Sequence, residues 1–333
     1  MGLQDRLQMD GQYVLKNNKI VIMKMKKHWL WVILICFVAG CSGKKLLTNN
    51  NPIDEILLDE TGWTIDTLRN DVIWYKFSSA TDKQFADQNV NVICFNPKAK
   101  GQLIFDYKKE KDSLSVFAGR IPGAIAGINA TYFLEKKDSA DYMHLRLKGK
   151  DLQQVKIPKT SIYWWKHQGM FTFNDEGNAF EIRFSPENFG TVKSANIMTG
   201  APMLIDNFNP VGLKFADTTG MGSKVNKLHY EHYLRHQGVR HPRTAIAVTK
   251  EGYLLLITVD GRNKIAKGMS AKELTEFLRR YFNPKSAMNI DGGGSTMMWV
   301  KGQPYNGIVN YPTDNKKFDH YGQRMVETVI IIK

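Results

Sequence analysis

Cysteine is scarce in this sequence, with three residues in 333: Cys36, Cys41 and Cys94. Their spacing matches no zinc-ligand pattern. Once the N-terminal segment described below is removed and Cys41 is modified, only Cys94 is left, so an intrachain disulfide is excluded. Cys94 lies inside the apolar, strand-like segment Val90–Phe95. We therefore expect a buried core thiol there and not a catalytic nucleophile.

Long hydrophobic runs are missing as well. An apolar run of ten residues, Trp29–Val38, follows the basic residues Lys24, Lys26 and Lys27. A permanent transmembrane helix needs about 20 apolar residues. A short apolar core behind a basic segment is typical of a secretion signal, although an uncleaved anchor helix is the alternative.

The residues that follow the apolar run predict what happens to the signal. Val38-Ala39-Gly40-Cys41 resembles the lipobox of bacterial lipoproteins, in which the cysteine is lipidated and becomes the new N-terminus. We therefore predict a signal peptide over residues 1–40, in which residues 1–22 are a mis-assigned start. A lipidated tether over 41–52 and one domain over 53–333 would follow. The expected location is an exported lipoprotein anchored in a membrane through Cys41.

Acidic residues are fewer than basic ones, 32 against 46, and the formal net charge is +14. Removal of residues 1–40 takes away six basic and two acidic residues and leaves +10. A positive surface of this size attracts anionic partners. The lysines are scattered and not clustered with aromatic residues, and an exported protein rarely meets nucleic acid. We therefore expect an anionic or phospho-linked glycan as the partner and no nucleic acid.

Strand signals dominate beyond Pro52, where no linker, repeat or low-complexity segment occurs. Two hairpins are predicted from apolar runs that flank turn residues. Ser270 and Glu273 form a capping box that begins an amphipathic helix, and a weaker helix is predicted over Ile53–Leu58. This pattern predicts an α+β fold with mixed, largely buried β-sheets and few helices. The expected strands cover residues 72–77, 90–95, 102–107, 142–147, 170–173, 179–184, 244–249 and 254–259.

Two of these apolar runs end in the same way. Leu254–Val259 leads into Asp260-Gly261-Arg262, and Ala287–Ile290 leads into Asp291 and three glycines. A helical crossover between the runs would return the second strand alongside the first. Both aspartates would then lie at one edge of a sheet.

The triple glycine is open to different interpretations. A nucleotide P-loop is disfavoured because no lysine is present and the strand-like Thr296–Val300 follows. A plain turn remains possible. We favour an anion or sugar cradle, in which backbone N–H groups line a concave nest. Its members would be Gly292, Gly293, Gly294 and Ser295.

Several motifs occur together in an order that resembles the phosphodiester glycosidase family, over roughly residues 70–333. Two positions depart from the family pattern: Ala130-Thr131 replaces Gly-Gly, and Glu327-Thr328 replaces Ala-Asn. Larger residues in place of the two glycines predict a narrower site and an altered substrate. The motifs are Asn129–Phe133, Thr199–Ile205, His241–Val248, Val259–Arg262 with Gly268–Ser270, and Asn289–Ser295.

The resemblance implies hydrolysis of the bond between a sugar's anomeric carbon and a phosphodiester. Carboxylates should flank the anomeric carbon, so Asp291 is expected as nucleophile or base and Asp260 as its partner. Because the phosphate leaving group is already anionic, cationic hydrogen-bond donors matter more than a strong acid. The expected substrate-binding residues are Arg243, Arg262, Arg324 and His241 for the phosphate, and Asn129 and Asn310 for sugar hydroxyls.

Other functions remain open. The spacing of His229, His232 and His236 would put them on one helical face, where they could bind a metal, but a polar insertion is favoured. No cofactor or metal is therefore expected. The main alternative function is a non-catalytic glycan-binding lipoprotein that serves exopolysaccharide assembly. A weaker one is hydrolysis of another wall polymer, such as a teichoic-acid-like phosphodiester or peptidoglycan.

Overall fold

The structure is a computed structural model that describes residues 62–79, 82–133 and 142–333. The predicted signal peptide, the lipid-attachment residue Cys41, the tether and the predicted helix at Ile53–Leu58 lie outside these residues. Those predictions therefore stay predictions. Among the described residues, no helix has the length and apolarity that a membrane crossing requires.

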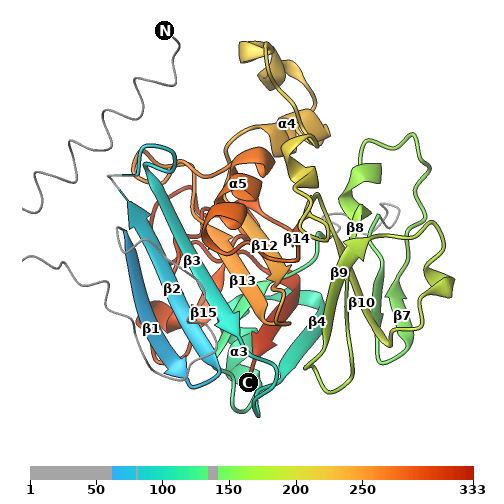
Figure 1. Ribbon diagram of the computed structural model, residues 1–333, viewed down its shortest axis with the longest axis vertical. Coiled ribbons are helices and arrows are strands. Elements are labelled where there is room, and N and C mark those ends of the chain that lie inside the picture. Colours follow the sequence, from blue (N-terminus) through green and yellow to red (C-terminus); the bar gives the residue numbers. More distant parts are fainter. Residues whose placement is uncertain (1–61, 80–81, 134–141) are drawn as a thin grey trace, which may run out of the picture. The chain divides into compact units, whose positions relative to one another are not determined.

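The largest sheet has seven strands and carries the two motifs that end in aspartate (Figure 1). Its central strands, β12 and β13, are buried along their whole length. Strands that are covered on both faces read as continuous apolar runs, which explains why the sequence shows little alternation here. In spatial order the strands are β1 (Trp63–Arg69), β2 (Val72–Ser79), β3 (Gln88–Phe95), β13 (Leu254–Val259), β12 (Arg243–Val248), β14 (Ser286–Asn289) and β11 (Met203–Ile205).

A helix covers one face of this sheet. α5 (Ala271–Tyr281) begins at the predicted capping box of Ser270 and Glu273. Its buried side packs aromatic rings onto β1 and β2, with the ring centroids of Phe277 and Phe77 5.4 Å apart. The apolar stripe of the helix therefore closes this face of the core.

A four-stranded sheet packs against the opposite face. Ile128 from this sheet shares one apolar cluster with Ile246 and Leu256 of β12 and β13. The outer face of the same sheet is covered by α3 (Leu114–Arg120), which buries Phe117 against it. The strands are β15 (Met298–Val300), β5 (Ala126–Asn129), β16 (Val326–Ile332) and β4 (Leu103–Asp112).

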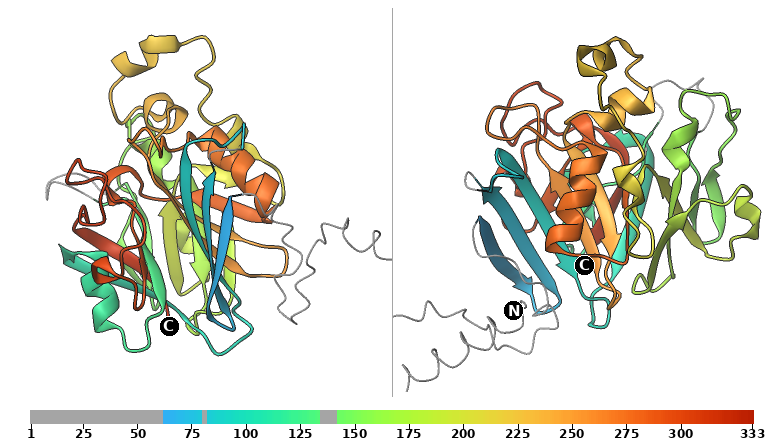
Figure 2. Two further views of the ribbon diagram at one scale, coloured as in Figure 1. Left: turned by 90° about the vertical axis from the view of Figure 1, so that its left-hand side faces the viewer. Right: turned by 45° about the horizontal axis from the view of Figure 1, so that its top comes forward.

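A five-stranded sheet lies beside these layers, as Figures 1 and 2 show. Its order is β7 (Lys150–Gln153), β6 (Leu145–Leu147), β10 (Asn196–Gly200), β8 (Gly169–Phe173) and β9 (Phe180–Phe184). The short 3-10 turns are η1 (Trp164–His167), η2 (Phe189–Thr191), η3 (Val211–Leu213), η4 (Gly222–Lys227), η5 (Gly293–Ser295) and η6 (Tyr305–Gly307).

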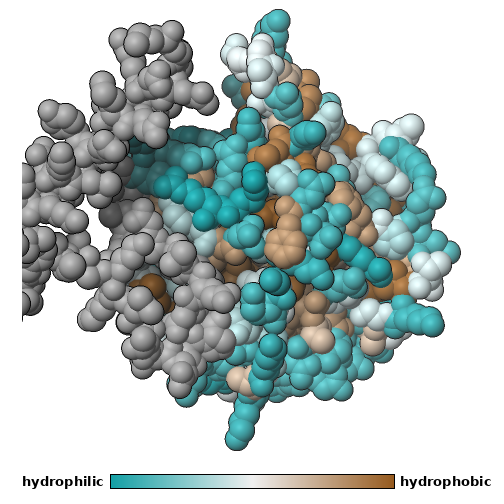
Figure 3. Space-filling model, viewed as in Figure 1, coloured by the Kyte–Doolittle hydropathy of each residue, from teal (hydrophilic) through white to brown (hydrophobic). Residues whose placement is uncertain are grey.

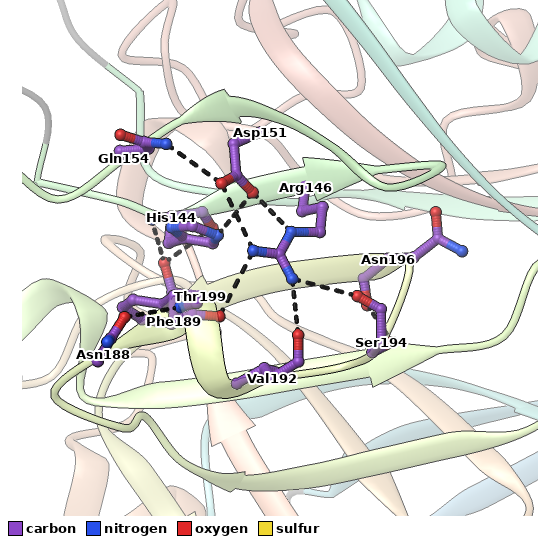
Figure 4. A network of polar contacts seen from close by, with 11 residues as sticks. His144, Arg146, Asp151, Gln154, Asn188, Phe189, Val192, Ser194, Asn196 and Thr199 are labelled. Atoms are coloured by element: carbon purple, nitrogen blue, oxygen red, sulfur yellow. Dashed lines mark hydrogen bonds and ion pairs between the residues drawn. The ribbon is translucent and has the colours of Figure 1, made fainter.

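A polar network fixes one end of the five-stranded sheet (Figure 4). The guanidinium of Arg146 donates to the carboxylate of Asp151 at 2.6 Å and to the carbonyl of Val192 at 2.8 Å. The ring of His144 stacks on Phe189 with centroids 4.2 Å apart and lies 3.2 Å from Asp151. Burial lowers the pKa of His144. The network joins β6 and β7 to the loop before β10.

An excursion between β11 and β12 projects from the sheets at the top of Figure 1. It contains η3, η4 and α4 (Tyr233–Gly238). The excursion matters because it returns the chain to the edge where β12 begins.

In the face that Figure 3 shows, hydrophilic residues dominate the described surface and hydrophobic ones form scattered patches.

The predicted fold class is confirmed: buried sheets with few helices. Both predicted hairpins form, β8 with β9 and β12 with β13, and Cys94 is fully buried. Two details differ. The named strands pair antiparallel throughout the described residues, so the sheets are not mixed. The strand expected over 142–147 covers only β6.

Candidate active site

Asp260 and Asp291 follow strands that end at the same edge of the large sheet. β13 and β14 each pair antiparallel with β12, so the two run in the same direction. The sequence predicted that they would be neighbours, but β12 lies between them. Two inter-strand spacings separate them, about 10 Å. The hairpin of β12 with β13 takes the adjacent position, so the α5 crossover has to place β14 one strand further away.

Asp291 is partly buried at this edge. Its backbone N–H donates to the carbonyl of Ala130 at 3.1 Å, and its own carbonyl accepts from Asn129 at 2.6 Å. Burial raises the pKa of its carboxyl to about 6, against the lowering effects of the Ser295 hydrogen bond and the positive charge of Lys166. The carboxylate therefore sits among polar groups in a partly open position.

Asp260 has a different environment, because it is 1% exposed. Its carboxylate accepts from the side chains of Asn89 (2.7 Å) and Asn310 (2.9 Å) and from the backbone N–H of Tyr311 (2.9 Å). Burial raises its pKa to about 6, and these hydrogen bonds limit the rise. Both oxygens are occupied by neutral protein donors. The Asp260 carboxylate is therefore enclosed by protein groups. The sequence had predicted that it would face a ligand together with Asp291.

The two predicted sugar-binding asparagines are also fully buried. Besides Asp291, Asn129 contacts the hydroxyl of Thr244 at 2.9 Å and the N–H of Met297 at 3.0 Å. Asn310 accepts from the N–H of Met298 at 2.7 Å. Their amides are used to join loops from different sheets, which is a supporting role and leaves no access to sugar hydroxyls.

In the triple-glycine loop, two of the four N–H groups of the predicted nest donate to the protein itself. The N–H of Gly293 donates to the carbonyl of Pro242 at 2.8 Å, and that of Ser295 donates to the carbonyl of Gly292 at 3.1 Å. Gly293 has a φ of 62°, in the left-handed region that favours glycine. The loop is a tight turn whose N–H groups at 293 and 295 are already used by the protein.

Two arginines lie against this loop instead. A methyl group built on Gly293 would lie 3.2 Å from Nη2 of Arg262, and one built on Gly294 would lie 2.6 Å from Nη2 of Arg324. Arg262 is exposed, has a φ of 63°, and donates to the hydroxyl of Thr313 at 3.0 Å. The absence of a side chain at these two glycines therefore lets two guanidinium groups approach the backbone closely.

Arg324 links the loop to Asp291. Its Nη1 donates to the Ser295 hydroxyl at 3.3 Å, and its guanidinium pairs with Asp314 at 2.5 Å. Ser295 in turn donates to the carboxylate of Asp291. Asp291, Ser295 and Arg324 thus form one polar chain along the glycine loop.

Arg243 was predicted to bind phosphate, but the structure buries it completely. Its guanidinium donates to the carbonyls of Met269 (2.8 Å), His236 (3.0 Å) and Val239 (2.8 Å) and to the side chain of Gln237 (2.7 Å). Burial lowers its pKa to about 10. The sequence pattern did not distinguish Arg243 from Arg262. In the structure, Arg243 holds the excursion onto β12 and faces no solvent.

His241 lies between these groups. Burial lowers its pKa to about 3, with further lowering by Arg243 and Arg262, so the imidazole is neutral. Its Nδ1 has no hydrogen-bond partner among the described residues. Its ring faces Tyr230 at 6.1 Å, and the Tyr230 hydroxyl would lie 3.9 Å from a methyl group on Gly293. His241 and Tyr230 therefore border the same loop as Arg262.

Lys166 and Glu231 belong to the same region and were missed from the sequence. Lys166 is 6% exposed, and its ammonium lies 2.7 Å from a carboxylate oxygen of Glu231. Four aromatic rings surround it, the nearest being Tyr132 at 4.7 Å. The charges of both residues act on Asp291. The only sequence signal was a lysine within a dense aromatic stretch, Tyr163–His167.

The three histidines of the excursion do not share a helical face. His232 caps α4 by accepting from the N–H of Leu234, and His229 accepts from the N–H of Glu231 before the helix begins. His236 lies within α4 and is buried. In the part of the chain that the structure describes, no group of three or more His, Cys, Asp or Glu residues is placed to hold a metal ion.

The two departures from the family pattern contact each other. The hydroxyls of Thr131 and Thr328 are 2.8 Å apart, and the N–H of Thr131 donates to Thr328 at 2.9 Å. Ala130, Thr131 and Thr328 are all buried. The side chains of Thr131 and Thr328 thus pair inside the core between β5 and β16, and the expected narrowing of the site stays a prediction.

Comparisons with known proteins agree with this architecture. The profile of a family described as phosphodiester glycosidase matches residues 122–333. N-acetylglucosamine-1-phosphodiester alpha-N-acetylglucosaminidase of Mus musculus is 33% identical over 91 residues, which are 27% of this chain and 16% of that protein. The SPbeta prophage-derived uncharacterized protein YomE of Bacillus subtilis is 37% identical over 73 residues, 21% of this chain and 11% of that protein. The matched part thus spans at most about a sixth of these relatives.

Solved structures show the same fold. The zebrafish N-acetylglucosamine-1-phosphodiester alpha-N-acetylglucosaminidase catalytic domain, auto-inhibited by its pro-peptide, aligns with a TM-score of 0.53 at 16% identity. The alignment covers 82% of this chain and 84% of that one. A hypothetical protein from Synechocystis aligns with a TM-score of 0.51 at 15% identity, covering 82% and 64%.

Proposed function

This chain belongs to the phosphodiester glycosidase family, and we propose that it hydrolyses a sugar-1-phosphodiester bond in a surface or periplasmic glycan. The observation that carries the proposal is the polar chain along the glycine loop. This chain of contacts brings the partly open carboxylate of Asp291 together with Arg324, while Arg262 lies against Gly293.

Asp291 is the proposed general base. With a pKa of about 6 it is roughly 90% ionised at pH 7, and a base with a pKa near the working pH is the most effective. A water molecule gives its oxygen to the anomeric carbon and loses a proton to Asp291. The bond from that carbon to the phosphate oxygen breaks, and its electron pair leaves with the phosphate.

Arg262 and Arg324 are the proposed phosphate-binding residues. The leaving phosphate is a stable anion, so the transition state gains most from donors that match its oxygens. A guanidinium offers two parallel N–H groups to two oxygens. Asp260, Asn129, Asn310 and Arg243 act as supports that fix the loops carrying these groups.

The proposal is tested with a methyl diester of N-acetylglucosamine-1-phosphate in water labelled with oxygen-18. We expect free sugar that carries the label and a phosphate monoester that does not. Label in the phosphate would show cleavage of a P–O bond and would refute a glycosidase.

An Asp291→Asn variant should lose at least 100-fold in kcat, because its amide cannot accept the proton. The matched control is Asp217→Asn, which changes an exposed carboxylate in the excursion and should retain full activity. Equal turnover in the two variants would remove Asp291 from the mechanism. Glycan binding by the wild type without any product would favour the alternative, a non-catalytic glycan-binding lipoprotein.

We also propose that the protein is exported and anchored through a lipid on Cys41. The support is the sequence alone: the basic segment, the apolar run Trp29–Val38 and the lipobox-like Val38–Cys41. In cells, a Cys41→Ser variant should move from the membrane fraction to the soluble fraction. Unchanged membrane retention of that variant would contradict lipid attachment at this residue.

A further inference from the structure

Five aromatic side chains gather on the loop between β15 and β16. Four of them form a continuous stack: Tyr305 on His320 (4.3 Å between centroids), His320 on Tyr311 (4.3 Å), and Tyr311 on Phe318 (4.2 Å). The fifth, Tyr321, stands at 88° to Tyr305 with centroids 5.6 Å apart. We call this group the aromatic wall.

The outer end of the aromatic wall faces solvent. Tyr321 is 70% exposed and Tyr305 is 45% exposed. Tyr305 and the following Asn306 both have a φ near 57°, which L-residues rarely adopt. Non-glycine residues persist in this conformation only where the surroundings impose it, and such positions cluster at functional sites. The loop thus holds an aromatic ring outward in an unfavourable backbone conformation.

The same loop is attached to the proposed active site at three points. Tyr311 donates its N–H to Asp260 at 2.9 Å. Thr313 accepts from Arg262 at 3.0 Å, and Asp314 pairs with Arg324. Thr313 also forms a backbone bridge to Gly322, the residue next to Tyr321. One short connection therefore separates the exposed rings from the arginines that are proposed to bind phosphate.

We propose that Tyr305 and Tyr321 form a saccharide-binding subsite for the glycan chain that is joined to the scissile phosphodiester. A pyranose ring has an apolar C–H face and polar edges. Half-exposed tyrosines match it, since each offers an apolar ring with a polar tip. The inference rests on the proposed function only in placing the bound glycan chain next to the arginines that are proposed to bind phosphate.

Area and charge favour a sugar over a protein partner. A tyrosine buries at most about 250 Å², so two exposed rings supply far less than the roughly 800 Å² per partner of a stable protein interface. This area suits one or two sugar rings. Charges of both signs occur near the rings: Lys316 and Lys317 stand close to Asp319 in the sequence, while Asp314 pairs with Arg324. The two rings themselves are uncharged and suit the uncharged part of a glycan, and the arginines suit its phosphate.

The test compares Tyr321→Ala and Tyr305→Asn with the wild type; asparagine tolerates the left-handed backbone at 305. The matched control is Phe184→Ala, which removes a 41% exposed ring from the edge strand β9. Binding is measured by retardation in gels that contain phosphomannan, dextran or chitin oligosaccharides. We expect each tyrosine variant to lose at least tenfold in affinity for the polymer that the wild type binds best, and the control to lose less than twofold.

Kinetics separates this inference from the proposed function. On the small methyl diester, both tyrosine variants should keep kcat/KM within twofold of the wild type, and their melting temperatures should stay within about 2 °C. Ring-dependent binding without hydrolysis by the wild type would keep the subsite and overturn the hydrolase. Wild-type-like binding by both variants, no binding of the wild type to any of the polymers, or unfolding of both variants would overturn the subsite.

Discussion

Replacing Gly294 by alanine tests whether the position of Arg324 controls catalysis. The added methyl group would lie 2.6 Å from Nη2 and 2.9 Å from Cζ of Arg324, and 2.9 Å from Oδ1 of Asp314. Non-bonded heavy atoms prefer about 3.5–4.0 Å, so the guanidinium has to retreat by about 1 Å. Its hydrogen bond to Ser295 is already 3.3 Å long and would be lost.

The cost to folding should be small. The side chains of Arg324 and Asp314 are 31% and 38% exposed, and such pairs contribute at most about 1 kcal/mol. The cost to catalysis should be much larger. A displacement of about 1 Å in a positioning group costs roughly 100-fold in rate, which corresponds to about 2.7 kcal/mol of transition-state stabilisation.

The assay is kcat/KM for sugar release from the methyl diester, measured together with urea unfolding. Gly119→Ala is the matched control, because a methyl group at this exposed position of α3 meets no atom within 4 Å. It should leave activity unchanged and add about 0.5–1 kcal/mol of stability, since alanine favours a helix over glycine. If Gly294→Ala retains kcat/KM within threefold while folded, Arg324 does not contact the transition state.

Four further predictions concern charge and burial. Because Asp291 has to be ionised, kcat/KM should rise as the pH increases from 5 to 7, with a midpoint near 6; a profile without this limb would exclude Asp291 as the base. Burial also raises the pKa of Asp260 from 3.8 to about 6, so the folded state keeps a proton that the unfolded chain loses. Stability should therefore fall as the pH rises from 4 to 6, and urea midpoints for Asp260→Asn should show a shallower slope. Arg243→Lys should destabilise the protein by about 3–5 kcal/mol in urea unfolding, because lysine cannot satisfy the four buried acceptors; an unchanged midpoint would contradict this. Lys166→Met should cost about 2–3 kcal/mol by leaving the Glu231 carboxylate unpaired, and adding Glu231→Gln should recover at least half; no recovery would show that the pair is not the cause.

Local features of the fold were predictable because neighbours in the sequence determine them. The capping box of Ser270 and Glu273 begins α5 where expected. The two hairpins form because each turn lies between apolar runs that pair with each other. Continuous apolar runs indicated sheets covered on both faces. The motifs of the last hundred residues indicated the family in the same way, since each is a short contiguous segment.

The roles of individual site residues were not predictable, because they depend on what lies across the sheets. Asp260 and Asp291 have the same local sequence, a strand followed by Asp-Gly, yet Asn310 and Tyr311 close over Asp260 alone. Lys166 reaches Glu231 from 65 positions away, beyond any local pattern.

The sequence by itself determined the strands of both hairpins, the main helix, the family and the shared sheet edge at which Asp260 and Asp291 follow their strands. Only the tertiary structure decided which charged groups at that edge are exposed to solvent. Arg243 and Arg262 each adjoin a family motif, but Arg243 is enclosed by α4 and its flanking carbonyls and Arg262 is exposed. Solvent access and hydrogen-bond saturation separate them, and both arise from segments that meet only when the chain has folded.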